Sequence, residues 1–346
     1  MRTDHQAEPA VGAPGRAATA VAHPNIALIK YWGKRDERLM IPYVDSLSMT
    51  LDVLPTTTTV RLDPTARTDS VTLDGSPAEG EVRRRVTDFL ELLRERSGCF
   101  EPAVVDTRNS VPTGAGLASS ASGFAALAMA GAAAYGLDLD RTGLSRLARR
   151  GSASASRSLF DGFAICHAGR GAGATADIGS YAEPVPAPDF DPALVVALVD
   201  EGAKAVSSRA AMRRTVETSP LYRAWAASSR ADLAEMRTAL LRGDLDAVGE
   251  IAERNALGMH ATMLAARPAV RYLSPATVAV LDSVLRLRSD GVPAYATMDA
   301  GPNVKVLCHR ADAARVAEAV RGAAPGCSVV TARRGPGARL QTGAGW

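Results

Sequence analysis

The sequence contains one long glycine-rich turn, Val111-Pro-Thr-Gly-Ala-Gly-Leu-Ala-Ser-Ser-Ala-Ser-Gly123, which runs directly into an alanine-rich helical pattern. Gly114 and Gly116 allow the backbone to turn tightly and to approach a ligand closely. Ser119 and Ser120 are suited to cap the helix that follows. Unpaired N–H groups at a helix start, with the positive end of the helix dipole, suit a phosphate. The turn lacks the Gly-Lys-Ser/Thr of a Walker A loop, and on spacing alone an ordinary loop before a core helix fits equally well.

Strand and helix patterns surround this turn without a regular βαβ alternation, which favours an α+β fold over a doubly wound sheet. Runs rich in β-branched or apolar residues predict strands at 25–31, 46–53, 56–62, 103–109, 194–199, 295–299, 304–308 and 328–332. Helical periodicity predicts helices at 81–96, 118–135, 142–149, 221–241, 245–265, 275–289 and 311–323.

The length of 346 residues suggests two domains. Segments rich in Gly, Ser or Pro at 149–173 and 181–191 lie near mid-chain, so we expect a boundary near residue 190 and domains over 21–190 and 191–346. Residues 1–20 are rich in Ala, Gly and Pro and lack a continuous apolar stretch. They are expected to form a disordered leader rather than a signal peptide.

Composition excludes several classes of protein. Hydrophobic residues make up 47% and charged residues 22%, as in ordinary globular proteins. A net charge of +3 argues against a dedicated nucleic-acid binder. The four cysteines are widely spaced, which argues against structural zinc and a disulfide framework. The longest apolar run, near 124–135, is too short to cross a bilayer. We therefore expect a cytoplasmic protein without a membrane span.

Lysine is rare in this chain. The 40 basic residues comprise 36 Arg and the four lysines Lys30, Lys34, Lys204 and Lys305. Arg and Lys are not interchangeable, so a chain that uses Arg by default should keep Lys where a compact, flexible ammonium is needed. Codon bias with a few random survivors is the alternative.

Two of these lysines end an apolar strand pattern. Residues 22–34 run from an apolar stretch into Lys30, Tyr31 and Lys34, with Asn25 near the start. Two ammonium groups at a strand end can meet phosphates as point charges. A strand that leaves the core with a polar tip is the common alternative.

Two Ser-Arg segments offer further groups for an anion. In residues 150–158, small hydroxyl side chains alternate with small apolar ones around Arg157, whose guanidinium could clamp a carboxylate. In residues 204–212, a second Ser-Arg pair follows Lys204. Taken singly, the first could be a flexible Ser/Ala linker and the second a solvated helix start.

The fifth segment, Met298-Asp-Ala-Gly-Pro-Asn303, places Asp299 at the end of a strand pattern and before a Gly-Pro turn. A carboxylate fixed there could orient or deprotonate a hydroxyl, although Asp often starts such turns. Taken together, the five segments suggest a substrate that carries several phosphates and a carboxylate.

These five segments resemble, in the same order, the motifs of the diphosphomevalonate decarboxylases, a family of the GHMP kinase superfamily. The stretches are NIALIKYWGKRDE (25–37), PTGAGLASSASGFAALA (112–128), GSASASRSLFDGF (151–163), SSRAAM (207–212) and MDAGPN (298–303). KYWGK and the GSxSAxRS pattern distinguish the decarboxylases from sister kinases. The resemblance implies a GHMP kinase fold with two domains and an active site in the cleft between them.

The resemblance also implies a reaction. ATP, with Mg2+, would phosphorylate the tertiary 3-hydroxyl of (R)-5-diphosphomevalonate, and loss of phosphate and CO2 would give isopentenyl diphosphate. It implies a homodimer that acts on small molecules, without nucleic acid or membrane. Alternatives are a relative that acts on the monophosphate, a kinase that stops after phosphorylation, and a non-catalytic sensor. The intact diphosphate-binding set and Asp299 favour the decarboxylase.

Each role is carried over by motif position. Asp299 would orient or deprotonate the hydroxyl, Lys30 would lie near it, and Arg157 would hold the carboxylate. The substrate and its diphosphate would be lined by Tyr31, Lys34, Ser152, Ala153, Ser154, Arg157, Ser208, Arg209 and Met212. The ATP phosphates would be wrapped by Pro112, Gly114, Ala115, Gly116, Leu117, Ala118, Ser119, Ser120 and Ser122, with Ser119 or Ser120 near Mg2+.

The chain departs from the family pattern at three positions. Val44 and Asp45 stand where the family often has Asn and Ser, and Ala153 stands where Gly is common. A carboxylate at position 45 near phosphates would be unfavourable unless it is paired, so the hydrogen bonds expected of this segment are in doubt.

Overall fold

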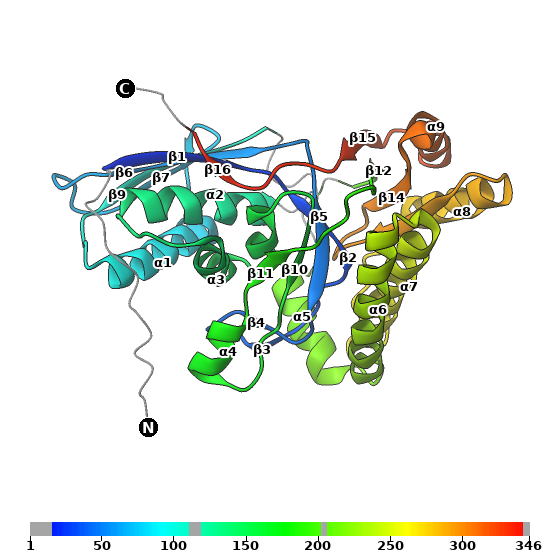
Figure 1. Ribbon diagram of the computed structural model, residues 1–346, viewed down its shortest axis with the longest axis horizontal. Coiled ribbons are helices and arrows are strands. Elements are labelled where there is room, and N and C mark those ends of the chain that lie inside the picture. The colour runs from blue at the N-terminus through cyan, green and yellow to red at the C-terminus, as the bar shows by residue number, and fades with distance from the viewer. Residues whose placement is uncertain (1–15, 111–118, 201, 203–205, 342–346) are drawn as a thin grey trace.

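The computed structural model describes residues 16–110, 119–200, 202 and 206–341. Within these ranges the strands form three sheets and one short hairpin, and helices pack on each sheet (Figure 1). The first two sheets belong to the N-terminal half, and the third belongs to the C-terminal half. The mixture of helices and strands confirms the predicted α+β class.

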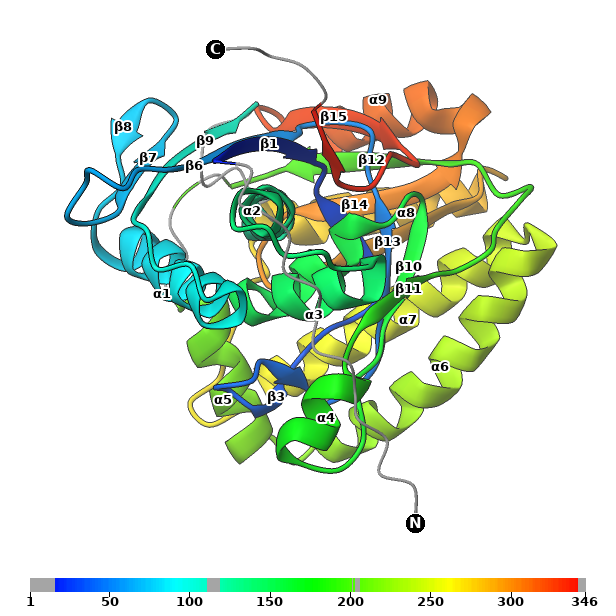
Figure 2. The same ribbon diagram turned by 60° about the vertical axis from the view of Figure 1, so that its left-hand side comes forward.

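In the first sheet, strands from the two ends of the described chain lie side by side at one edge. Its strands, in spatial order, are β16 (Arg339–Leu340), β1 (Ala17–Ala22), β6 (Thr56–Leu62), β9 (Ala103–Asn109), β7 (Ser70–Leu73) and β8 (Ser76–Pro77). The helices on its inner side are α1 (Gly80–Ser97), α2 (Ser119–Ala134) and α3 (Arg141–Gly151) (Figure 2). The alanine-rich α2 is buried on most sides and packs on β1 and β6, because small side chains let the helix approach the sheet closely.

The second sheet carries the first motif. Its strands, in spatial order, are β11 (Ala182–Pro184), β10 (Phe163–Cys166), β5 (Ser46–Thr50) and β2 (Asn25–Ile29). Beside it lie the hairpin of β3 (Lys34–Asp36) and β4 (Ile41–Pro42), the short helix α4 (Gly173–Gly179) and the 3-10 segment η1 (Ala153–Leu159). Every residue of β2 is buried, so the strand delivers Lys30 to the interior rather than to the surface.

The third sheet is covered on both faces. Its strands, in spatial order, are β13 (Ala294–Met298), β14 (Val304–His309), β12 (Pro192–Leu198) and β15 (Ser328–Arg333). The C-terminal helices are α5 (Ser208–Thr218), α6 (Tyr222–Arg242), α7 (Leu245–Leu264), α8 (Pro275–Ser289), α9 (Ala313–Ala323) and the 3-10 turn η2 (Arg310–Asp312). Alternate residues of β12 face opposite sides, because Val195 packs with α8 and α9 whereas Leu194 packs with α6 and α7.

The two halves share one hydrophobic core. Ile26 of β2 and Phe163 of β10 lie in the same buried cluster as Leu194 of β12, Met236 of α6 and Val248 of α7. Burial of this joint core fixes the end of β2 against the C-terminal helices. The first and fifth sequence motifs therefore meet, although more than 250 residues separate them.

Two expectations about the ends of the chain are wrong. Residues 17–20 were expected in a disordered leader, yet they belong to β1, which pairs with β6 along its whole length. Residues 339–340 were assigned to the C-terminal domain, yet β16 pairs with β1 in the first sheet. The chain thus returns to the N-terminal half to complete its edge. The boundary near residue 190 stays a prediction.

The segment 149–173, which composition marked as linker-like, is structured in its central part. Ser156, Arg157 and Ser158 of η1 are almost completely buried. The flexible-linker alternative is therefore wrong, because small side chains here serve close packing.

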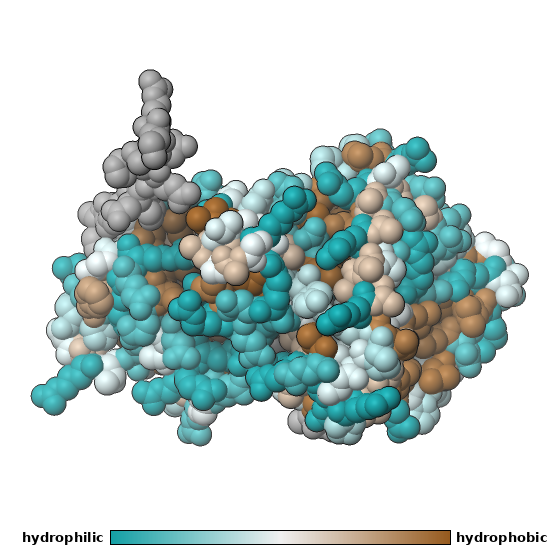
Figure 3. Space-filling view, turned by 90° about the horizontal axis from the view of Figure 1, so that it is seen from below, coloured by the Kyte–Doolittle hydropathy of each residue, from teal (hydrophilic) through white to brown (hydrophobic). Residues whose placement is uncertain are grey.

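Viewed from below, the surface is dominated by hydrophilic side chains, with hydrophobic ones gathered mainly toward one end (Figure 3). Within the described ranges, none of the helices combines the length and the apolar character that a membrane crossing would need.

Candidate active site

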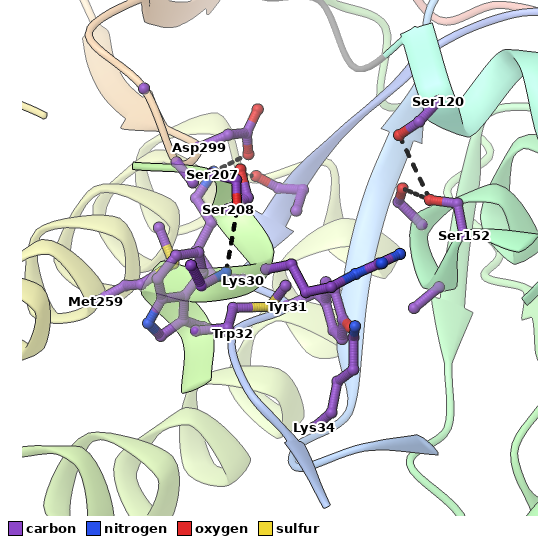
Figure 4. Close-up of a pocket in the computed structure, with 18 of the residues that line it drawn as sticks. Lys30, Tyr31, Trp32, Lys34, Ser120, Ser152, Ser207, Ser208, Met259 and Asp299 are labelled. Atoms are coloured by element: carbon purple, nitrogen blue, oxygen red, sulfur yellow. Dashed lines mark hydrogen bonds and ion pairs between the residues drawn. The ribbon is translucent and has the colours of Figure 1, made fainter. Parts of the chain in front are cut away.

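A cleft of about 580 Å3 opens where the second sheet, α1 and η1 face the C-terminal half. This size suits a polar small molecule. All five sequence motifs contribute described residues to its walls, and the contribution of the glycine-rich motif is Ser120. Figure 4 shows Ser120 and Ser152 on one side of the cleft and Asp299, Lys30 and Met259 on the other.

Asp299 is held between two lysines. It follows the last residue of β13, and its Oδ1 accepts a hydrogen bond from Lys30 Nζ at 2.9 Å. Its Oδ2 lies 3.2 Å from Lys305 Nζ, which comes from the neighbouring strand β14. Both lysines are buried, whereas one-third of the Asp299 side chain is exposed to the cleft. The carboxylate is thus fixed at the cleft floor with one side open to a ligand.

The charged groups of this cluster shift one another's pKa values. Burial alone would raise the pKa of Asp299, but attraction to Lys30 and then to Lys305 outweighs it and holds the pKa well below its usual range. Burial lowers the pKa of Lys30 to about 8, although Asp299 acts in the opposite direction. At neutral pH the carboxylate is ionised and Lys30 is mainly cationic.

The backbone after β2 turns sharply to present its polar residues. Gly33 has φ +92, and a Cβ atom there would lie 2.1 Å from the hydroxyl oxygen of Tyr222. That hydroxyl donates a hydrogen bond to the carbonyl of Trp32 at 2.8 Å. Because only glycine fits this position, the chain can bury Trp32 and still return Lys34 to the cleft.

Arg157 is a buried cation that lines the cleft. Its guanidinium donates to Ser48 Oγ at 2.9 Å, to Ser46 Oγ at 2.7 Å and to Asn25 Oδ1 at 3.3 Å. All three acceptors are neutral, and no carboxylate among the described residues pairs with Arg157 in an ion pair. The side chain is therefore fixed in place with its charge uncompensated, as suits an anionic ligand.

A row of hydroxyl groups joins the start of α2 to η1. Ser120 Oγ lies 3.4 Å from Ser152 Oγ, which lies 3.1 Å from Ser154 Oγ. Asn25 Nδ2 donates to the carbonyl of Ser154 at 2.9 Å and so holds this end of the row. Ser152 and Ser154 line the cleft with Ala153 between them. The predicted substrate residues of this motif therefore stand together.

Basic side chains gather at the end of the cleft beyond Tyr31. Lys34, Arg84, Arg85 and Arg209 all line this end. Burial lowers the pKa of Lys34 to about 8, and repulsion from Arg209 adds to the effect. Arg209 lies 3.7 Å from Glu81, a weak exposed ion pair. Such mutual repulsion would be relieved by a bound polyanion.

The remaining predicted substrate residues also reach the cleft. Ser208, Arg209 and Met212 of α5 line it, and Met212 is buried. The hydroxyl of Tyr31 is buried and has no hydrogen-bond partner among the described residues. Burial also raises the pKa of Tyr31 above its usual value, so the group stays a neutral donor and acceptor. A buried polar atom of this kind is suited to a ligand.

Most of the predicted nucleotide loop lies outside the described residues. This applies to Pro112, Gly114, Ala115, Gly116, Leu117 and Ala118. Ser119 begins α2, but its side chain is likewise outside the description. Ser122 is buried, and its hydroxyl lies 2.7 Å from Thr56 Oγ1 rather than in the cleft. Their contacts with ATP stay predictions.

Two of the three departures from the family pattern, Val44 and Asp45, are accommodated away from the cleft, whereas Ala153 lines it. Asp45 accepts a hydrogen bond from the backbone N–H of Ala168 at 2.6 Å. Arg35 donates to the carbonyls of Ala168 and Gly169 at 2.8 and 2.7 Å, so both side chains hold the same loop. Val44 is buried in the cluster that contains Trp32. The doubt about an unpaired carboxylate is thereby resolved.

Sequence reasoning did not assign Lys305, Arg84 or Arg85 to the site. A lysine in the otherwise apolar strand pattern 304–308 was an available signal, because a buried lysine needs a partner. Arg84 and Arg85 carried no such signal, since arginines on a helix usually face solvent. Their place in the cleft depends on the packing of α1 against α2 and α3.

No cluster of three or more His, Cys, Asp or Glu side chains able to hold a metal occurs in the ranges that the structure covers. Hydroxyl oxygens such as that of Ser120 are hard ligands of the kind Mg2+ accepts. Among the described residues, Ser120 could offer such an oxygen to a magnesium ion that accompanies a nucleotide.

Comparisons with known proteins agree on one family. Residues 22–178 match the family model described as the diphosphomevalonate decarboxylase-like N-terminal domain, and residues 194–336 match the mevalonate 5-diphosphate decarboxylase C-terminal domain. A phosphomevalonate decarboxylase of Haloferax volcanii is 35% identical over 88% of this chain and 91% of its own length. A diphosphomevalonate decarboxylase of Ganoderma lucidum is 36% identical over 84% of this chain and 77% of its own.

A solved structure described as MDDEF in complex with MVAPP, AMPPCP and magnesium has the same fold. It superposes with a TM-score of 0.88 at 43% sequence identity, over 94% of this chain and 98% of that one. This similarity confirms the two-domain α+β fold that the sequence motifs implied.

Proposed function

The chain belongs to the diphosphomevalonate decarboxylase family, and from this premise we propose that it converts (R)-5-diphosphomevalonate to isopentenyl diphosphate with consumption of ATP. The tertiary 3-hydroxyl is phosphorylated first. The C3–O bond then breaks with its electron pair leaving on phosphate, and the bond to the carboxylate supplies the pair of the new double bond as CO2 departs. The products are isopentenyl diphosphate, CO2, phosphate and ADP.

One observation carries this proposal: Asp299 is fixed between Lys30 and Lys305 on the floor of a cleft that is also lined by the cations Arg157, Lys34 and Arg85. The substrate has three features that need recognition, namely a tertiary hydroxyl, a carboxylate and a diphosphate. The cleft offers a carboxylate acceptor, a buried guanidinium and a basic end. These match the three features one for one.

Asp299 acts on the hydroxyl by orienting it. Because both lysines depress its pKa, the carboxylate is a weak base in the resting cleft. It is better suited to accept the hydrogen bond of the hydroxyl and aim the oxygen at the phosphoryl group than to retain the proton. Phosphoryl transfer proceeds through a loose transition state, so positioning and charge stabilisation contribute most of the catalysis.

Arg157 holds the substrate carboxylate. The neutral acceptors Ser46, Ser48 and Asn25 fix its guanidinium without cancelling the charge. The carboxylate must stay ionised to depart as CO2, and a cation keeps it ionised. When phosphate leaves, positive charge develops at C3 and loss of CO2 relieves it.

The diphosphate occupies the basic end of the cleft. Lys34 and Arg209 supply charge, and Tyr31, Ser152 and Ser154 supply hydrogen bonds. A monophosphate carries less negative charge, so some of the basic side chains that repel one another at this end of the cleft would have no anionic partner. This charge surplus favours the diphosphate substrate over the monophosphate named for the Haloferax volcanii relative.

ATP is the co-substrate and Mg2+ accompanies it, in line with the nucleotide analogue and magnesium of the similar complex. We place the polyphosphate between the start of α2 and the basic side chains of α1, with Ser120 and Arg85 beside it. The ion, when bound, neutralises charge on the transferring phosphates. Ser119 or Ser120 would contribute a hydroxyl oxygen to it.

The homodimer that the resemblance implies and the cytoplasmic location expected from the sequence are part of the same proposal. Light scattering on a size-exclusion column measures the first. A mass of one chain across the working concentration range would remove the dimer from it.

The test is turnover of carboxyl-labelled substrate. The protein is incubated with ATP, Mg2+ and (R)-5-diphosphomevalonate, and CO2 and ADP are measured together. Equal amounts of both are expected. ADP without CO2 would show a kinase, binding without either product would show a sensor, and faster turnover of mevalonate 5-phosphate would show the monophosphate relative. Mevalonate and ATP-free reactions serve as controls.

A further inference from the structure

Side chains of helix α7 form hydrogen bonds with the backbone of both partners of the ion pair between Lys30 and Asp299. The two partners are 269 residues apart in sequence, one after β2 and the other after β13. Their separation in space therefore depends on how two distant strands are placed. Asn255 and His260 of α7 each reach one of these strand ends.

On the Lys30 side, the contact is a buried hydrogen bond. The backbone N–H of Lys30 donates to Asn255 Oδ1 at 2.8 Å. The amide of Asn255 cannot rotate freely, because its Nδ2 donates to Asp232 Oδ2 at 2.8 Å and to Ser229 Oγ at 3.1 Å. Asp232 in turn accepts from Arg254 Nε at 2.8 Å. Both polar atoms of the Asn255 side chain thus form hydrogen bonds. The position of the Lys30 backbone is therefore set by α6 and α7.

On the Asp299 side, the contact comes from an imidazole. His260 Nε2 lies 3.1 Å from the carbonyl oxygen of Asp299. A carbonyl only accepts hydrogen bonds, so Nε2 carries the proton. Burial, together with repulsion from the nearby Lys30, lowers the pKa of His260 to about 4, so the ring is neutral at pH 7. The same carbonyl also accepts from Gly301 N at 2.8 Å, which closes the turn after β13.

The helix itself is seated rigidly. A Cβ atom on Gly249 would lie 2.1 Å from the ring of Tyr295 in β13, so only glycine permits this approach. Trp225 Nε1 donates to the carbonyl of Asn255 at 3.1 Å and ties α6 to α7. Asn255 and His260 stand about 7.5 Å apart along the axis. One stiff element thus spans both strand ends.

We propose that Asn255 and His260 are positioning residues that set the geometry of Lys30 and Asp299 for phosphoryl transfer. Neither side chain lines the cleft formed by the described residues, so both act through the pair rather than on the substrate. The expected effect on turnover rests on the proposed function. The expected effect on the geometry of Lys30 and Asp299 rests on the hydrogen bonds alone. A displacement near 1 Å at a reacting centre costs about 100-fold in rate.

The kinetic test compares four variants of the full chain. His260→Phe keeps an aromatic ring without the donor, His260→Gln restores an N–H, and Asn255→Leu removes the acceptor while keeping the branched shape of the side chain. Thr262→Val is the control, because Thr262 lies on the same helix, is equally buried and donates its hydroxyl hydrogen bond to the carbonyl of Met259 within that helix. We expect kcat to fall roughly 10- to 100-fold in His260→Phe and Asn255→Leu, with KM changed less than about threefold, and to recover largely in His260→Gln.

A second measurement reads the geometry without turnover. The chain has only four lysines, so protein labelled with 13Cε-lysine gives few signals, each assignable by single Lys→Arg replacement. We expect the Lys30 signal and its titration midpoint to move in His260→Phe and Asn255→Leu and to stay in place in Thr262→Val. This readout decides the inference even if the wild-type protein turns over none of the substrates, a result that would refute only the proposed function.

Three results would overturn the inference. The first is a Lys30 signal that is unchanged in both variants. The second is a kcat loss that Thr262→Val reproduces at equal thermal stability. The third is a loss confined to KM, or one that His260→Gln fails to relieve. If Asn255→Leu does not fold, the two His260 variants still separate these outcomes.

Discussion

Replacement of Lys305 by Met removes one of the two cations that hold Asp299. Lys305 Nζ lies 3.2 Å from Asp299 Oδ2, and it also donates a hydrogen bond to the carbonyl of Asn303 at 3.3 Å. Methionine is of similar length and apolar, so it fits the buried strand β14 without a cavity. The carboxylate then keeps only Lys30 and becomes free to rotate.

The expected loss follows from this contact. A hydrogen bond to a charged group contributes about 1.5–3 kcal/mol. Since 33% of the Asp299 side chain is exposed, solvent screening places the value at the lower end, about 1.5–2 kcal/mol. If the whole of this free energy is lost in the transition state, kcat falls roughly 10- to 30-fold. Lys30 still depresses the pKa of Asp299, so the carboxylate stays ionised and orientation alone is impaired.

The assay is steady-state release of ADP and CO2 with each substrate varied in turn. Arg310→Met is the matched control, because Arg310 also lies 3.2 Å from an aspartate, Asp191, but both side chains of that pair are at least half exposed. We expect a lower kcat, a nearly unchanged KM and no effect in the control. A kcat within twofold of wild type, or an equal loss in Arg310→Met, would refute the orienting role of Lys305.

Four further outcomes are expected. Asp299→Asn should lower turnover by several orders of magnitude with modest loss of substrate binding; an unchanged kcat would remove Asp299 from the mechanism. Arg157→Lys should reduce kcat/KM far more than the exposed replacement Arg310→Lys, because a point charge cannot satisfy the acceptors that fix the guanidinium fork; equal effects would exclude the clamp. Lys34→Met should raise KM for the diphosphate substrate more than for the monophosphate, and parallel increases would contradict a contact with the distal phosphate. Finally, Lys30 and Lys34 both have pKa values lowered to about 8, so their cationic forms predominate below pH 8 and are lost above it. The pH profile of kcat/KM should therefore fall on the alkaline side near pH 8, whereas no acid limb should arise from Asp299, and a flat profile to pH 10 would contradict the need for these cations.

Much of the fold could be predicted because its elements are locally encoded. The Thr-rich run 56–62, the strand 103–109 and the helix 275–289 occur at the predicted bounds. Helix α8 begins with a capping box between Ser274 and Thr277 and Pro275 at its first turn, signals that need no tertiary partner.

The elements that were missed depend on partners far away in sequence. Strand β1 of Ala17–Ala22 has the composition of a disordered leader and becomes ordered by pairing with β6. Strand β16 has only two residues and exists because β1 offers an edge. The buried segment 153–159 has linker-like composition, and only its packing against Asn25, Ser46 and Ser48 shows its purpose.

Sequence alone determined which chemical groups the protein carries and in which order. Four lysines among 40 basic residues, a glycine-rich turn before an alanine helix and an aspartate before a Gly-Pro turn are all readable along the chain, because each depends on neighbours within a few residues. Tertiary structure alone decided that Lys30 and Lys305 grip the same carboxylate, that Arg84 and Arg85 face the cleft and that α7 spans the pair. These relations arise from burial of a core shared by both halves of the chain, and no local pattern encodes a contact across 269 residues.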